Sequence, residues 1–197
     1  MLSMKTILES LTGQRAAEAF VQWLAKESED FAADQQKYLA AIEALRVELG
    51  DAVTDEIDAI VRQCTSNLLF SAFLGLKANL DNFINPVARN FLDVDFEVYL
   101  REETSHRLPE YEHAQNVRGQ FYSLLTPAQK ETYADVVTYT CHLETVGPKL
   151  AHYCGYMLGN ELLPWVIPGY HADFGLTMRY IAMLEEYFGK GFLPTVL

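Results

Sequence analysis

The stretch TPAQKETYADVVTYTCHLETV, residues 126–146, decides the fold class of this chain. Thr126 is suited to cap a helix with its hydroxyl, Pro127 suits the first helical position, and Gln129 completes a capping box. We therefore predict a helix that begins at Pro127 and continues to the end of this stretch. Gly147-Pro148 follows it and is predicted to break the helix.

The rest of the chain repeats the helical spacing, and alternation of the β type is nearly absent. A stripe of large side chains at steps of seven, among them Phe31, Tyr38 and Leu45, predicts a long helix from about Gln14 to Leu49. The other expected helices are 3–11, 55–83 with Thr54 as N-cap, 87–107, a restart at Pro109, 149–163 after the break, and 175–188. We predict an all-α fold, an irregular and mostly antiparallel bundle of about six to eight helices.

Charge is distributed unevenly along what we expect to be a single helical domain of residues 1–197. The chain has 15 basic and 27 acidic side chains, a net charge of −12. Residues 1–113 hold 10 basic and 20 acidic side chains, whereas residues 114–197 hold 5 and 7, which leaves that more apolar part near neutral. Such an acidic surface repels nucleic acid and anionic membranes. The near-neutral part favours contact with a protein partner.

Cysteine usage and hydropathy predict a cytoplasmic protein. Cys64, Cys141 and Cys154 form no disulfide framework, so we expect all three to be reduced, with Cys64 on the buried side of its helix. Met1–Gln14 lacks the apolar core of a signal peptide. The longest apolar run, around Leu68–Leu76, is too short to cross a bilayer.

The sharpest candidate for a metal site is a pair of Glu-x-x-His sequences, Glu103 to His106 and Glu110 to His113. At about 100° per residue, all four side chains fall within roughly 80° of one helix face. If the chain stays helical through Pro109, they form a carboxylate–imidazole stripe suited to iron, manganese or zinc. If the helix restarts at Pro109, which we favour, the two pairs diverge.

This pattern resembles a fragment of the di-iron site of ferritin-like bundles, over about ten residues. The resemblance implies metal binding with oxidase or storage chemistry. That family takes its two Glu-x-x-His motifs from different helices and adds a glutamate from each of two others. Here both pairs lie on either side of one proline, and no other expected helix carries such a pair. The alternative is a solvated acidic helix junction that binds nothing.

A second group of possible metal ligands surrounds the predicted break at Gly147-Pro148. Its members are Cys141, His142, Glu144, His152 and Cys154. A soft metal site could form there if the chain turns back on itself. The alternative is two buried cysteines that act as small hydrophobic residues, with two histidines at the edge of the core.

Near the last helix, Asp173 is predicted to be an N-cap.

Common enzyme signatures are missing from the sequence, which has no phosphate-binding glycine loop, no G-x-S-x-G and no H-E-x-x-H. We therefore favour a non-catalytic protein that acts through protein–protein association, with a metal-binding bundle or a sensor of small apolar ligands as alternatives.

In the apolar turn Pro164–Gly169, the side chains of Trp165 and Ile167 are expected to be shielded from water. A homodimer is expected through large side chains of the C-terminal part: Trp165, Ile167, Tyr180, Met183 and Tyr187.

Overall fold

The structure is a computed structural model that describes residues 22, 25, 29–86, 91–104 and 108–190. The helices are α3 (Glu29–Leu49), α4 (Asp51–Ile84), η1 (Phe91–Asp93, a 3₁₀ helix), α5 (Phe96–Thr104), α6 (Leu108–Leu124), α7 (Pro127–Val166) and α8 (Phe174–Phe188). No strand occurs in these ranges, so the predicted all-α class is confirmed. The expected helix 3–11 and most of the first half of the expected helix 14–49 lie outside the described residues.

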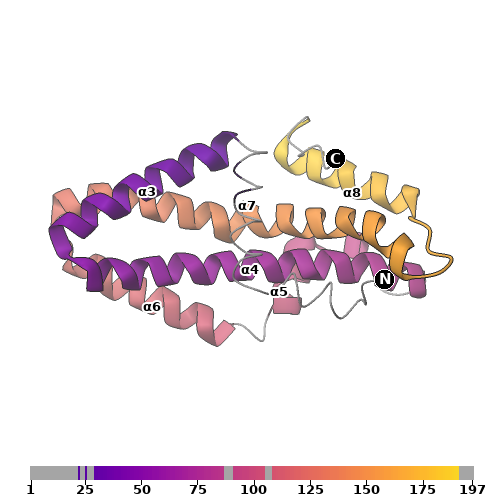
Figure 1. The fold of residues 1–197 in the computed structure, drawn as a ribbon, viewed down its shortest axis with the longest axis horizontal. Helices are drawn as coiled ribbons and strands as arrows, with labels where there is room; N and C mark the ends of the chain where they lie inside the picture. Colours follow the sequence, from indigo (N-terminus) through magenta and orange to yellow (C-terminus); the bar gives the residue numbers. More distant parts are fainter. Residues whose placement is uncertain (1–21, 23–24, 26–28, 87–90, 105–107, 191–197) are drawn as a thin grey trace.

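Two long helices, α4 and α7, form the centre of the molecule and run in the same direction (Figure 1). Leu68 packs against Gly147 at the middle of α7, and Asn79 packs against Gly159 further along both helices. The neighbouring helices α3 and α8 run antiparallel to α7, because each joins the pair through a short connection at one end (Figure 1).

Glycines allow α4 and α7 to approach until their backbones touch. A Cβ atom added at Gly75 would lie 1.9 Å from the carbonyl oxygen of His152, and one at Gly155 would lie 1.7 Å from that of Ala72. No side chain fits at such distances, so glycine is required for this contact. The close approach sets the positions of all side chains that face across the pair.

The remaining helices cover the central pair in two groups. In Figure 1, α3 and α6 flank the first halves of α4 and α7, whereas α5 and α8 lie along the second halves. The buried apolar residues divide in the same way into two clusters. One is centred on Phe31, Leu45, Leu68 and Leu143, and the other on Phe91, Tyr156, Tyr180 and Leu184.

The predicted break at Gly147-Pro148 is wrong, because α7 continues through Pro148 and Pro164 as one helix of 40 residues. A proline inside a helix removes one backbone hydrogen bond, at a cost of about 3 kcal/mol. Residues 149–156 are all buried, so this part of α7 has packing partners on every side. That burial outweighs the lost bond.

Local capping signals had mixed outcomes. The capping box of Thr126 and Gln129 is confirmed, with the backbone N–H of each residue donating to the side chain of the other. Asp173 caps α8 as predicted, since its carboxylate accepts from the N–H of Leu176. Thr54 is not an N-cap: α4 begins at Asp51, and the buried Thr54 hydroxyl donates to backbone carbonyl oxygens of the first turn.

The Pro109 restart agrees with the structure, where α5 ends at Thr104 and a separate α6 begins at Leu108. Pro109 therefore lies in the first turn of a helix, where a missing N–H costs little. None of the described helices is long and apolar enough to cross a membrane.

Candidate functional site

Glu103 of the first Glu-x-x-His pair lies on α5, whereas Glu110 and His113 of the second pair lie on α6. Glu103 lies half-buried in the last turn of α5, and His113 is exposed on α6. A hydrogen bond to Asp81 raises the pKa of Lys77, and the carboxylate of Glu103 adds to that rise. Glu103 is thus within electrostatic range of a lysine on α4.

The metal prediction itself stays a prediction, since His106 and the side chain of Glu110 lie outside the described residues. Within the part of the chain that the structure describes, no group of three or more His, Cys, Asp and Glu side chains is placed to hold a metal ion.

The second group of possible ligands is dispersed along α7. His142 pairs with Asp34 of α3 at 3.0 Å, whereas His152 is bonded to Tyr180 of α8. Ten residues of continuous helix separate the two histidines by about 15 Å along the axis. A shared site would need the turn at Pro148 that does not form. Of the two cysteines in this group, Cys141 is exposed and Cys154 is buried.

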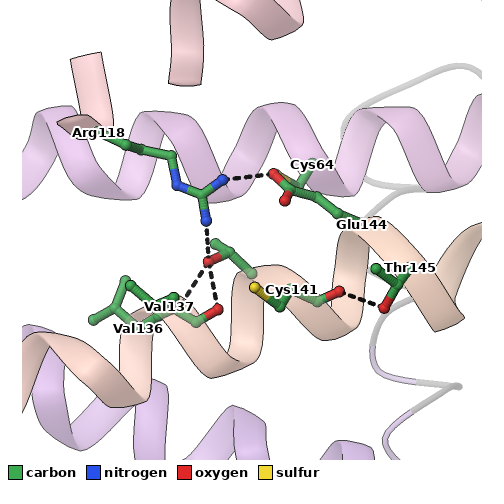
Figure 2. Close-up of polar contacts among 8 residues, drawn as sticks. Cys64, Arg118, Val136, Val137, Cys141, Glu144 and Thr145 are labelled. Atoms are coloured by element: carbon green, nitrogen blue, oxygen red, sulfur yellow. Dashed lines mark hydrogen bonds and ion pairs between the residues drawn. The ribbon is translucent and has the colours of Figure 1, made fainter. Parts of the chain in front are cut away.

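A buried polar network links three helices instead, as Figure 2 shows. The guanidinium of Arg118 on α6 donates to Glu144 Oε1 at 2.7 Å and to Thr140 Oγ1 at 2.5 Å, both on α7. From α4, the thiol of Cys64 donates to the same carboxylate oxygen at 3.4 Å. The Arg118 and Glu144 side chains are only 11% and 15% exposed, so water screens their attraction weakly.

The electrostatics of this network keep the Cys64 thiol protonated. Burial raises the pKa of Cys64 to about 12, and the negative charge of Glu144 adds to the rise. A protonated thiol is a weak nucleophile and a poor metal ligand. Cys64 therefore serves as a hydrogen-bond donor to Glu144, and the network ties α4, α6 and α7 together.

In the second apolar cluster, the imidazole of His152 is surrounded by aromatic rings. His152 and Tyr180 are both fully buried, and their hydrogen bond joins Nδ1 to the hydroxyl at 2.6 Å. Burial lowers the pKa of His152 to about 3, so the ring is neutral at physiological pH. Among the described residues, its Nε2 finds no hydrogen-bond partner. Three more rings lie with centroids 5.0–5.6 Å from the imidazole: Phe91, Phe96 and Tyr99.

A hollow of about 360 Å³ opens at the end of the molecule where α4 and α7 finish and α8 begins. Its floor carries an amide network. Asn79 donates to the carbonyl oxygen of Tyr156 and to Asn160 Oδ1, and it accepts from the hydroxyl of Tyr170. The aromatic residues around it are Phe83, Tyr156, Tyr170, His171 and Phe174.

Sequence reasoning did not find Arg118, Asn79 or Tyr170. Arg118 meets Glu144 across 26 residues, and Asn79 meets Tyr170 across 91, so the sequence around each residue does not reveal these partners. A polar residue inside an apolar stretch, such as Asn79 after Leu74 and Leu76, was the one available signal.

Comparison with known proteins finds no matching family model, no similar curated protein and no similar solved structure.

Proposed function

We propose that this chain is a non-catalytic helical protein that acts by protein–protein association, and that it associates first with a second copy of itself. The surface proposed for this contact is the end of the bundle where α4 and α7 finish and α8 begins. The strongly perturbed groups Cys64 and His152 are buried and held inside the fold, which supports a role without catalysis.

The observation that carries the proposal is a group of four exposed apolar side chains at this end; the other four exposed large apolar residues in the described ranges lie on α3 and α6 (Leu39, Val47, Tyr122 and Leu124). Ile84 is 67% exposed, Trp165 79%, Phe174 77% and Met178 62%. They lie at the ends of α4 and α7 and in the first two turns of α8, which meet at one end of the molecule in Figure 1. Exposed apolar residues that gather in one region mark interaction surfaces.

This surface differs from the one expected from sequence. Tyr180 is fully buried, Met183 packs against the second core cluster, and the side chain of Tyr187 lies outside the described residues. Within one chain the ring of Trp165 is largely exposed, so its expected cover would have to come from a second copy. Phe174 and Met178 take the place of the buried residues, since they lie on the outer face of α8.

Charge supports a second copy as the partner. Residues 114–197 carry a net charge of only −2, against −10 for residues 1–113. On this surface, Arg179 is already paired with Asp93 at 2.8 Å. Two copies that meet here therefore repel each other much less than two copies that meet through the acidic part.

Sedimentation equilibrium tests the proposal. We expect the wild-type chain to have twice its 22.3 kDa mass at high concentration, and the Trp165→Ser/Met178→Ser variant to shift toward the monomer. The control is Val47→Ser, which changes a side chain that is 87% exposed at the other end of the molecule and should leave the dimer intact. A wild-type monomer at every concentration would contradict self-association.

A further inference from the structure

We propose that the hollow lined by Phe83, Tyr156, Tyr170, His171, Asp173 and Phe174 binds an organic ammonium ion. This site adjoins the apolar contact surface and shares Phe174 with it, but its chemistry is different. Its volume of about 360 Å³ lies within the range of small-molecule sites in proteins.

The aromatic rings are arranged as adjoining walls. The rings of Phe83 and Tyr170 have centroids 4.9 Å apart and are inclined at 50°, and those of Phe83 and His171 lie 5.4 Å apart at 84°. Rings inclined in this way are not stacked in parallel, so their faces point in different directions. A cation within about 6 Å of such a face is attracted by the ring quadrupole.

The charge of the lining has one sign. Asp173 supplies a carboxylate, and neither lysine nor arginine occurs among the described residues that line the hollow. Burial raises the pKa of Tyr156 on the floor, and the negative charge of Asp173 adds to the rise, so the field of this carboxylate reaches the interior. A positive ligand is favoured there and an anion is repelled.

Two polar groups of the floor, Asn79 and Tyr170, use their protons in hydrogen bonds within the protein. The Tyr170 hydroxyl gives its proton to Asn79 Oδ1, and the Asn79 amide gives its own to acceptors of the protein. The oxygen of Tyr170 thus keeps lone pairs for a donor. Alkylammonium groups need acceptors and π faces, whereas a phosphate or carboxylate would need donors.

Calorimetric titration with choline and with 3,3-dimethyl-1-butanol tests this inference, because the second molecule is the uncharged isostere of the first. We expect choline to bind with a millimolar or lower dissociation constant, and the isostere to bind about tenfold more weakly, since a cation–π contact contributes about 1–2 kcal/mol. Equal affinity of the two, or no heat from choline up to tens of millimolar, would overturn the proposal.

Two variants and a control locate the site. Asp173→Asn removes the charge but keeps an N-cap acceptor for α8, so the fold is retained and choline should bind several-fold more weakly. Phe83→Leu keeps apolar volume without a ring and should also weaken choline. Leu124→Ala, which changes an exposed side chain at the end of α6 outside the hollow, should leave choline affinity unchanged. Unchanged choline affinity in both lining variants would contradict the assignment.

Discussion

At the scale of single residues, His152 is the group whose burial has the clearest consequence. Its imidazole is fully buried among aromatic rings, and one of its nitrogens finds no partner among the described residues. Desolvation lowers the pKa from 6.5 to about 3, so the folded protein excludes a proton that the unfolded chain accepts.

This shift predicts a loss of stability in acid. Because the unfolded state binds the extra proton below pH 6.5, the free energy of unfolding falls as pH decreases from 6.5 toward 3. The loss from this group is about 2 kcal/mol at pH 5. Urea unfolding at pH 7 and pH 5 measures it, with the exposed His171 as the comparison: His171→Gln should keep the pH dependence and His152→Phe should reduce it. An unaltered dependence in His152→Phe would argue against this origin.

Cys64 and Cys141 give a second prediction at this scale. Cys64 is buried with a pKa raised to about 12, whereas Cys141 is exposed. Thiol titration of the native protein with a chromogenic disulfide should show one fast group, and Cys141→Ser should abolish that fast phase. Cys64 should react only as fast as the protein opens. Fast labelling that persists in Cys141→Ser would show that a thiol placed in the core is accessible.

At the scale of elements, the contact of α4 with α7 depends on glycine more than on large apolar side chains. The Cβ of an alanine at Gly155 would meet the backbone of Ala72, which cannot move without displacing the whole of α4. Because this contact is tight, the parallel helices α4 and α7 contribute side chains to both apolar clusters.

Gly155→Ala is therefore expected to destabilise the protein by about 3 kcal/mol or more, through overpacking against backbone. The matched control is Gly119→Ala on α6, where an added Cβ meets nothing within 4 Å. That change should stabilise by up to about 1 kcal/mol, because alanine is the better helix former. Chemical denaturation of both variants decides the matter, and similar effects of the two would refute the role given to this contact.

The continuity of α7 shows how element boundaries depend on surroundings. Thr126 and Gln129 begin the helix through contacts within four residues, so sequence predicts that end well. Pro148 is followed by eight consecutive buried residues, 149–156, and tertiary packing holds the helix there against local preference. Local rules predict a terminus when the signal is local, and fail where burial competes with it.

At the scale of the whole molecule, the arrangement in Figure 1 divides the roles of the protein between two regions. The half that contains α3 and α6 is held by the Arg118–Glu144 ion pair with Cys64, which links three helices. The opposite end carries the exposed side chains of Ile84, Trp165, Phe174 and Met178 and the hollow near Asp173. We therefore expect binding functions to map to the end where α8 begins, and changes at the other end to act through stability.

The sequence by itself determined the helical class, the capping residues Thr126 and Asp173, and the burial of Phe31, Tyr38 and Leu45. These features depend on periodicity and on contacts within one or two turns, which can be read along the chain. Only the tertiary structure decided that α7 passes through Pro148, that Cys64 meets Glu144, and that aromatic rings from three segments enclose a hollow. Those features join residues far apart in sequence, and their geometry depends on the closeness that glycine permits between α4 and α7.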